Sequence, residues 1–400
     1  MKRLTRFPRL VVAAAATTLV ACQGEPPTAP VGAASDPAAI VASPTSAPDF
    51  VHLTDGLEHT CGVTPDNRVF CWGYNHYGQL GDGTTTNRLL PRLVAGGVHF
   101  KVVSAGTNFT CGLGTDDKAY CWGDNSHGEV GDGSDQATRL KPAAVAGGRR
   151  FRQLRAGGDH TCAVTFNDVL FCWGNNSVEE LGAPTPTTDH SNVPLEVVTG
   201  GPVFHQVIPG GAHTCALTTD KVAYCWGDNS HGQLGNSVHF HTMTPTRVSG
   251  TRTFNQMAAG QNHTCGVSGG KAYCWGTNFR GELGDGTTSE RDVPTPVAGG
   301  LTFKATNALC GVTTSNQAYC WGNNSEGQVG DGTFGFRNFR TVPKKVVGGF
   351  TFVELSGSAT TVHNCAITPE RRAYCWGTNF FGELGNGNTK HSPRPVPVGG

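Results

Sequence analysis

A pair of cysteines followed by Trp-Gly occurs seven times along this chain. The first copy reads HTCGVTPDNRVFCWG and contains Cys61, Cys71 and Trp72, and all 7 tryptophans occupy the same place in their copies. The second cysteines of successive copies are 50, 51, 53, 49, 46 and 55 residues apart. A period near 50 with strand-like units is typical of repeat architectures such as propellers. The repeat therefore predicts the fold, and its seven copies can be compared with one another.

Each copy predicts a β-hairpin closed by a disulfide. If Cys61 lies opposite Cys71, then Val63 lies opposite Val69 and residues 65–67 form a three-residue turn. In the fifth copy the cysteines are one residue closer, and Gly269-Gly270 forms a two-residue turn that keeps the cysteines opposed. Opposed residues of antiparallel strands have close Cβ atoms, as a disulfide requires. The predicted pairs are Cys61–Cys71, Cys111–Cys121, Cys162–Cys172, Cys215–Cys225, Cys265–Cys274, Cys310–Cys320 and Cys365–Cys375.

The alternative is that these 14 cysteines are buried free thiols that fill a core. Disulfides require an oxidising compartment. In the chain-entropy model, each hairpin disulfide would stabilise the fold by about 2–3 kcal/mol.

The residues beside the cysteines predict sheets that are buried on both faces. The residue after each first cysteine is Gly or Ala, and the residue before each second cysteine is Phe or Tyr. These positions are opposed in the hairpin, and the tryptophan shares their face. A sheet with aromatic rings on one face and disulfide and valine on the other is expected where blades stack around an axis.

The amino terminus predicts export and lipidation. Residues 1–21 read as a signal peptide with a basic start and an apolar segment too short to span a bilayer. The segment LVAC, which ends at Cys22, resembles a bacterial lipobox, and Cys22 is the one cysteine outside the seven pairs. The resemblance implies lipidation of Cys22 in a bacterial lipoprotein. The alternative is an ordinary secretory signal with an incidental cysteine.

The rest of the chain divides into a tether and one repeat domain. Residues 22–49 are rich in Pro, Ala, Ser and Thr and predict a flexible tether, and residues 50–400 form the repeat array. With either kind of signal the chain leaves the cytoplasm, and Gln23 is not the Asp that retains well-known lipoproteins at the inner membrane, which favours the outer membrane, with the protein facing the periplasm or the cell surface. The net charge is +0, so nothing indicates a nucleic-acid partner.

The sequence after each Trp-Gly resembles a known family. The segments WGYNHYGQLGDG, WGDNSHGEVGDG and WGTNFRGELGDG share an Asn, an aliphatic residue and closing glycines. This pattern resembles the regulator of chromosome condensation repeat over residues of about 50 to 400. The resemblance implies an all-β, seven-bladed propeller. The sequence leaves open whether each P-x-x-V strand, such as residues 395–398, belongs to the blade before or after it, and whether the last one closes the ring by joining the first blade.

The function of the founding family member does not transfer to this chain. That protein is a nuclear guanine-nucleotide exchange factor, and its exchange activity depends on an inserted wedge. Repeat spacings of 46 to 55 residues leave no room for a long insertion, and an exported protein does not meet a cytosolic GTPase.

No residue set predicts catalysis, a resident metal or a cofactor. His59, His160, His213 and His263 share one repeat position, which indicates a structural role. His239 and His241 would share a strand face as a metal pair, but the sequence offers no further ligand at suitable spacing. Asp-Gly pairs such as Asp82-Gly83 indicate tight turns, because they lack the alternating ligands of a calcium loop.

The variable loop tips predict a protein-binding surface. The two residues after each repeated Asn differ among copies, and exposed aromatic and Arg side chains are common in protein interfaces. We therefore expect a monomeric, lipid-anchored interaction module whose partner is a protein in the envelope or outside the cell. The candidate binding residues are His76, Tyr77, His127, His231, Phe279, Arg280, Phe336, Arg337, Phe380 and Phe381.

Three alternatives remain. The tips are ordinary loop variation, the protein is a structural component of the envelope, or one propeller face acts as an enzyme or inhibitor. The third copy, in which Val178-Glu179-Glu180 replaces the usual Gly-containing turn, is the place to look for hidden chemistry.

Overall fold

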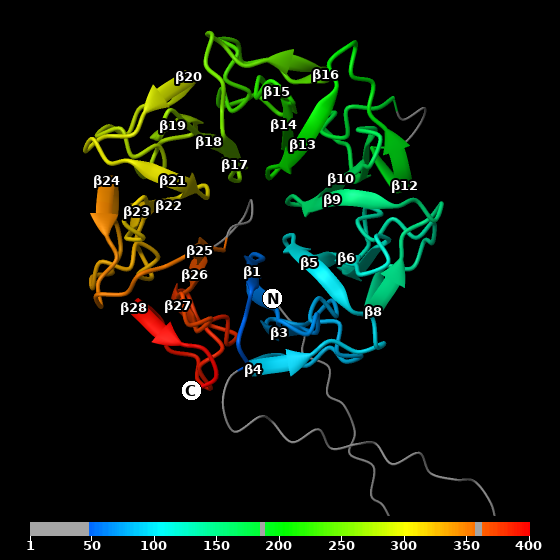
Figure 1. The fold of residues 1–400 in the computed structure, drawn as a ribbon, viewed down its shortest axis with the longest axis horizontal. Coiled ribbons are helices and arrows are strands. Elements are labelled where there is room, and N and C mark those ends of the chain that lie inside the picture. Colours follow the sequence, from blue (N-terminus) through cyan, green and yellow to red (C-terminus); the bar gives the residue numbers. More distant parts are fainter. Residues whose placement is uncertain (1–47, 185–188, 357–361) are drawn as a thin grey trace, which may run out of the picture. The chain divides into compact units, whose positions relative to one another are not determined.

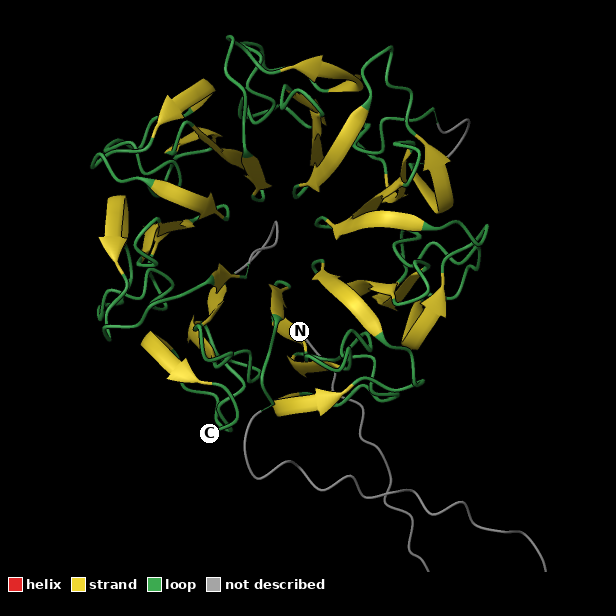
Figure 2. Ribbon diagram, in the orientation of Figure 1, coloured by secondary structure: helices red, strands yellow, loops and turns green. Residues whose placement is uncertain are grey.

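The protein is a seven-bladed β-propeller. The computed structural model describes residues 48–184, 189–356 and 362–400, which contain strands and no helix. The strands form seven four-stranded antiparallel sheets around a central axis (Figures 1 and 2). The fold predicted from the repeat is confirmed.

The first four blades contain these strands: β1 His52–Asp55, β2 His59–Val63, β3 Val69–Gly73 and β4 Arg88–Leu93; β5 Phe100–Ala105, β6 Phe109–Gly114, β7 Ala119–Asp124 and β8 Thr138–Ala144; β9 Phe151–Ala156, β10 His160–Thr165, β11 Leu170–Asn175 and β12 His190–Glu196; β13 Phe204–Pro209, β14 His213–Thr218, β15 Ala223–Gly227 and β16 Thr242–Arg247. The other three contain β17 Gln256–Ala259, β18 His263–Ser268, β19 Lys271–Gly276 and β20 Arg291–Pro296; β21 Phe303–Thr306, β22 Cys310–Thr313, β23 Ala318–Asn323 and β24 Phe339–Lys345; β25 Glu354–Leu355, β26 His363–Ile367, β27 Ala373–Gly377 and β28 Ser392–Pro397.

Each blade is built from consecutive strands, with the first strand beside the central channel and the fourth at the outer edge (Figure 1). The last strand, β28, pairs with β27 of its own blade. The P-x-x-V strand therefore belongs to the blade whose other strands precede it. The closure considered from sequence, in which the last strand joins the first blade, does not occur.

The predicted hairpin register and the seven disulfides are confirmed. Cys61 pairs with Cys71 in the ladder, and Val63 pairs with Val69. In the fifth blade Ser268 pairs with Lys271 across Gly269 and Gly270, which both have positive φ as the tight turn requires. The seven opposed cysteine pairs are disulfides with Cα–Cα distances of 4.0 to 4.1 Å.

Neighbouring blades pack an aromatic face against a disulfide face. Trp122 of the second blade lies in one core cluster with Cys61 and Cys71 of the first. Trp72 of the first blade packs in the same way against Cys365 and Cys375 of the seventh. The ring is therefore closed by side-chain packing of the same kind as at the other blade junctions.

The predicted signal peptide, Cys22 and nearly all of the predicted tether lie outside the described residues. Within the described ranges, no helix has the length and apolar character needed to cross a membrane.

Candidate functional site

The connections between the third and fourth strands of all blades lie at one end of the propeller. Antiparallel strands alternate in direction, so these connections lie at the end opposite to the hairpin turn between the second and third strands. We call this end the tip face. Its segments are residues 74–87, 125–137, 176–189, 228–241, 277–290, 324–338 and 378–391, of which 185–188 lie outside the described residues.

A buried asparagine organises each tip segment. In the first blade, the Asn75 side-chain oxygen accepts a hydrogen bond from the N–H of Leu80 at 2.9 Å, and its amide donates to the carbonyls of Thr84 and Thr86. Asn278 makes the same bonds to Leu283, Thr287 and Ser289. The invariant Asn therefore fixes the loop backbone while the two following residues remain free to vary.

A Glu or Gln four residues after this asparagine joins the tip segment to the next blade. Its side chain accepts the N–H two residues earlier, as Glu180 does from Val178 at 2.9 Å. Its backbone oxygen accepts the indole N–H of the next blade's tryptophan, as from Trp226 to Glu180 at 3.0 Å. Burial raises the pKa of Glu129, Glu180 and Glu383 to about 7. These carboxyls are therefore largely protonated in the folded protein below neutral pH.

The third blade keeps this architecture despite its unusual sequence. Glu179 stands where Gly78 stands in the first blade, and both have positive φ, 67° and 79°. Glu180 makes the same contacts as its counterparts, and Trp226 bonds to it. The Val178-Glu179-Glu180 segment is thus a variant of the common turn.

The aspartate of the Asp-Gly pairs in the tip segments forms an ion pair with an arginine in four of the blades. Asp82 accepts hydrogen bonds from the Thr84 hydroxyl and from Arg88, whose guanidinium nitrogen lies 2.6 Å from the carboxylate. Burial raises the pKa of Asp82, but the bonds from Thr84 and Arg88 lower it by more, so the net shift is downward. The aspartate therefore stabilises the turn, as predicted from the sequence.

The seven copies show that this aspartate and arginine occur together. The pairs are Asp82–Arg88, Asp132–Arg139, Asp285–Arg291 and Asp331–Arg340. Where the aspartate is replaced, the arginine is absent too: the matching residues are Asn236 and Thr242 in blade four, Asn386 and Ser392 in blade seven, and Ala183 and Ser191 in blade three.

Replacing Arg88 alone should therefore destabilise the protein. Arg88→Thr leaves the Asp82 carboxylate, which is 1% exposed, without its charged partner, and we expect a loss of about 2 kcal/mol in urea unfolding. The double variant Asp82→Asn/Arg88→Thr reproduces the fourth blade and should recover most of that loss. Equal stability of the single and double variants would contradict the pairing.

The predicted tip residues differ in exposure. His76, His127, Phe279, Arg280, Phe336, Arg337 and Phe380 are exposed, whereas Tyr77, His231 and Phe381 are half-buried. The half-buried members contact neighbours: Phe381 packs against Tyr74 of the first blade with ring centroids 4.7 Å apart, and His231 Nδ1 lies 2.6 Å from Glu290 of the fifth blade. Only the exposed members are available to a partner.

Exposed phenylalanines gather on the tip face of blades four to seven. Seven phenylalanines are exposed among the described residues, and only Phe166 lies elsewhere, in the opposite hairpin turn. The other six are Phe240, Phe279, Phe334, Phe336, Phe339 and Phe380. Phe240 and Phe334 lie in the fourth and sixth tip segments, and Phe339 is the first residue of β24, directly after the sixth. These three were not among the ten residues chosen from the sequence, although they lie in or beside its longer loops.

The shared-position histidines are structural and number five. His59, His160, His213 and His363 are fully buried, and each Nε2 bonds to a threonine hydroxyl of the next blade at 2.7 to 2.9 Å. His263 bonds to the Ala308 carbonyl at 2.8 Å. Burial lowers the pKa of His59, His160 and His363 to about 3 and that of His213 to about 4. The comparison of repeat copies within the chain had missed His363, which occupies this position in the seventh copy.

The buried group of Asp55, His363 and Cys365 has the composition of a metal site, but its sulfur is not free. Cys365 forms a disulfide with Cys375, and the Asp55 carboxylate accepts a hydrogen bond from the Ser356 hydroxyl. Burial raises the pKa of Asp55 to about 7, although the hydrogen bond from Ser356 lowers it in part. These residues join the first and seventh blades.

His239 and His241, considered from the sequence as a metal pair on one strand face, lie before β16 and not within a strand. His239 Nε2 instead lies 3.0 Å from the Asp292 carboxylate of the fifth blade. His239 and His241 are both exposed.

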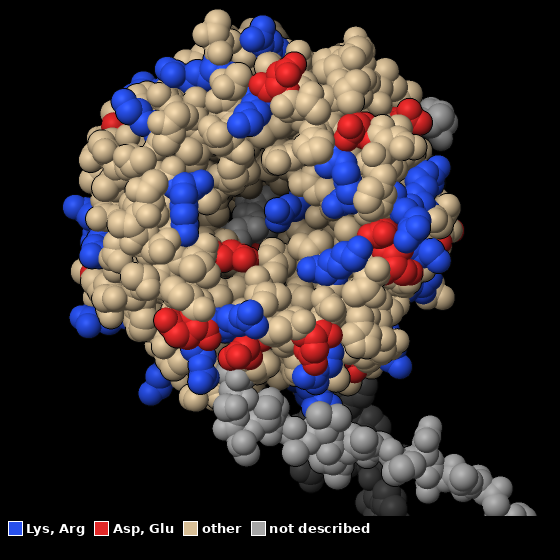
Figure 3. All heavy atoms as spheres, viewed as in Figure 1, with Lys and Arg blue, Asp and Glu red and all other residues tan. Residues whose placement is uncertain are grey.

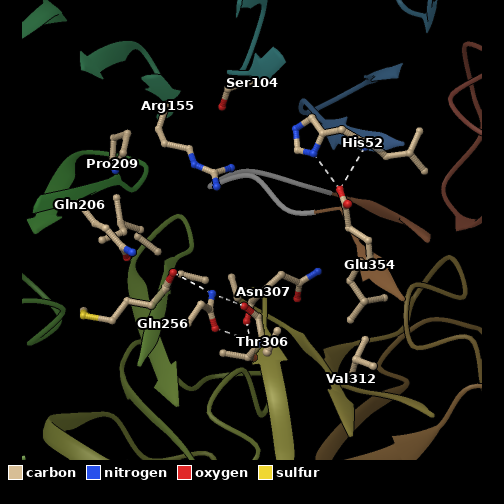
Figure 4. A pocket seen from close by; sticks show the side chains of 18 of the residues that line it. His52, Ser104, Arg155, Gln206, Pro209, Gln256, Thr306, Asn307, Val312 and Glu354 are labelled. Carbon is tan, nitrogen blue, oxygen red and sulfur yellow. Dashed lines mark hydrogen bonds and ion pairs between the residues drawn. The ribbon is translucent and has the colours of Figure 1, made fainter. Parts of the chain in front are cut away.

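A cavity of about 470 Å³ occupies the central channel and is lined by first-strand residues of all seven blades and by residues next to them. Arg155, Gln206 and Ser104 face it from the second to fourth blades, and His52 and Glu354 lie on the side opposite Arg155 and Gln206 (Figure 4). On the face seen in Figure 3, acidic and basic side chains are interspersed around the central opening.

Comparison with known proteins supports the family assignment made from the repeat. The model described as RCC1-like domain matches residues 28–315, and that described as regulator of chromosome condensation (RCC1) repeat matches residues 307–328. The ultraviolet-B receptor UVR8 of Arabidopsis thaliana is 29% identical over 220 residues, which are 53% of this chain and 49% of the receptor. The human E3 ubiquitin-protein ligase HERC2 is 30% identical over 52% of this chain and 4% of the ligase. The chain thus covers half or less of the length of these relatives.

Solved structures show the same fold. Human WBSCR16 has a TM-score of 0.73 with 20% identity, over 83% of this chain and 93% of that one. Prp20p of Saccharomyces cerevisiae has the same TM-score and identity over 88% of each chain. The CRINKLY WD40 ectodomain of the Arabidopsis thaliana receptor kinase ACR4 has a TM-score of 0.52 and 20% identity, over 86% of this chain and 98% of that one. With a matching family model over residues 28–315 and a repeat in every blade, this chain belongs to the RCC1-like domain family.

Proposed function

We propose that this protein is a lipid-anchored module of the cell envelope that binds another protein through the tip face of blades four to seven. The observation that carries the proposal is the position of six of the seven exposed phenylalanines of the described chain on that part of the molecule. Isolated exposed apolar residues are normal on protein surfaces, but aromatic rings grouped on one face are typical of interfaces.

The construction of the tip segments supports this proposal. Buried Asn and Glu or Gln side chains fix the backbone, so the exposed rings are held without a large loss of conformational freedom on binding. Phe279 is followed by Arg280 and Phe336 by Arg337, and Arg is also enriched in interface centres. Each of these four residues is exposed.

Related propellers offer partial support. One solved structure is of Kap60 bound to yeast RCC1, and the Prp20p structure is described with its binding to Gsp1p and histones. The ACR4 structure is of a receptor ectodomain. The anchoring part of the proposal is based on the lipobox-like segment ending at Cys22, and the disulfides are compatible with an oxidising compartment.

The proposal is tested by affinity capture from envelope extracts with the variant Phe279→Ala/Phe336→Ala/Phe380→Ala. We expect a partner bound by the wild type to be reduced at least tenfold, because the variant removes three exposed rings without touching the Asn or Trp contacts. Phe166→Ala is the matched control, since Phe166 and Phe380 are both 58% exposed but lie at opposite ends of their blades. Cys22→Ala should move the protein from the membrane to the soluble fraction.

Two outcomes would contradict the proposal. Capture unaffected by the triple variant, or reduced equally by Phe166→Ala, would place the interface elsewhere. Absence of any specific partner would favour a structural role in the envelope. Phe381 is left intact because its contact with Tyr74 joins the seventh blade to the first.

A further inference from the structure

The first strands of the blades line the central channel, and one of their positions breaks the repeat. Seven residues before the first cysteine, five blades carry Thr54, Ser104, Arg155, Ile208 and Ala258. Arg155 is the only charged residue among them. It extends from β9 into the cavity of about 470 Å³ (Figure 4).

Other polar side chains at the channel wall connect one blade to the next. Gln153 accepts the N–H of Val207 at 3.0 Å, Gln256 bonds to the N–H and carbonyl of Thr306, and Glu354 accepts the N–H of Leu53. These side chains therefore hold adjacent blades together at the channel wall.

Arg155 has no such role. Among the described residues its guanidinium makes neither a hydrogen bond nor a salt bridge, although the side chain is exposed to the channel. Loss of contact with water inside the channel lowers the pKa of the Arg155 guanidinium, and the negative charge of Glu354 raises it in part. An arginine remains charged under these conditions, so this cation faces the cavity without a partner in the described part of the chain.

Further hydrogen-bond donors lie on the same side of the channel. The Gln206 amide has no hydrogen-bond partner among the described residues, and the Ser104 hydroxyl accepts the Ala156 N–H at 2.9 Å but donates to no described group. Both side chains lie near Arg155 at the cavity (Figure 4). Across the cavity, Glu354 pairs with His52 at 2.8 Å.

We infer that the channel is a binding site for a small molecule that carries one carboxylate. A guanidinium matches a carboxylate with two parallel hydrogen bonds, and the Gln206 and Ser104 donors add to the same wall. A second negative charge on the ligand would face the Glu354 carboxylate, whereas an amino group there would be favoured. The site thus selects a monocarboxylate, and an amino acid over a dicarboxylate. It is separate from the tip face and does not depend on the proposed function.

The test is a titration of the full-length protein labelled with [¹⁵N]arginine, with the Arg155 Nε–Hε signal assigned by its loss in Arg155→Gln. Sodium acetate, glycine and sodium succinate are each added at an ionic strength matched with sodium chloride. We expect saturable shifts of the Arg155 signal with acetate and glycine. The dissociation constant for succinate should be at least threefold larger than that for glycine. Arg155→Gln should abolish binding, measured on the protein by calorimetry.

Arg247→Gln is the control, because Arg247 is an exposed arginine on the outer strand β16, away from the channel. It should bind glycine as the wild type does. Arg155→Gln removes no hydrogen bond or ion pair among residues 48–184, 189–356 and 362–400, so it should unfold at the wild-type urea concentration. A linear, non-saturable response, a shift equal to that from chloride alone, or binding retained by Arg155→Gln would overturn the inference.

Discussion

Trp226→Ala should lower the free energy of unfolding by about 4 kcal/mol, measured by urea denaturation of the oxidised protein. Trp226 is fully buried and packs against the Cys162–Cys172 disulfide of the preceding blade, with Leu181 and Val197 around it. Its indole N–H also donates to the Glu180 carbonyl at 3.0 Å. The variant therefore leaves a cavity at a blade junction and removes a buried hydrogen bond.

Two further variants divide this effect into its parts. Trp226→Phe keeps most of the apolar contact but lacks the N–H donor, so we expect a loss of about 2 kcal/mol. Phe166→Ala removes an aromatic ring that is 58% exposed and should change the stability by less than about 0.5 kcal/mol. A loss for Trp226→Ala no larger than that for Phe166→Ala would show that the tryptophan face does not hold adjacent blades together.

The features within one blade could be predicted from the sequence because they depend on neighbours along the chain. The Cys265–Cys274 copy lacks one residue, and only an opposed cysteine pair explains why the deletion falls in the turn. The hairpin register and the aromatic and disulfide faces followed from that observation. Strand alternation and turn length are local rules, so seven copies were enough to establish them.

Contacts between blades were harder to predict because they join residues about 50 positions apart. The partner of His160 is Thr214, and the position of one relative to the other depends on how the blades are rotated around the axis. The orientation of Arg155 toward the channel depends on the same rotation. The pairing of aspartate and arginine lies within one blade, and the sequence analysis missed it although Asp82 and Arg88 have counterparts that recur together in other copies.

The buried histidines and buried carboxyls should give the protein an asymmetric response to acid. Histidines whose pKa is lowered to about 3 stay neutral when folded but take up protons when unfolded below about pH 6.5. Their contribution to stability is present above pH 6.5 and is lost as the pH falls toward 3. Glu129, Glu180 and Glu383 act in the opposite direction: with a folded pKa of about 7, their contribution is present below pH 4.5 and is lost as the pH rises through 7.

These two sets offset each other between about pH 6.5 and 4.5, so we expect the free energy of unfolding to change little there. Below pH 4.5 the unfolded carboxyls are protonated too and their contribution stops changing, while the histidine contribution continues to fall. We expect a loss of about 2 kcal/mol between pH 4.5 and 3 for each histidine with a folded pKa of about 3. Paired aspartates such as Asp82, whose pKa is lowered, add to the loss in the same range.

The chain itself supplies the matched substitutions for this test. Phe109 occupies the histidine position in the second blade, so His160→Phe should fit over Gly157 as Phe109 fits over Gly106. We expect it to reduce the fall in stability between pH 4.5 and 3 by about 2 kcal/mol, whatever its effect at pH 7. Glu180→Gln copies Gln79 and Gln233 and should raise stability at pH 8 by about 1–2 kcal/mol, with little effect at pH 4, because glutamine needs no proton to remain neutral. If His160→Phe leaves the fall in stability between pH 4.5 and 3 unchanged, the neutral buried histidine does not cause that fall. Acid unfolding then begins at the paired aspartates.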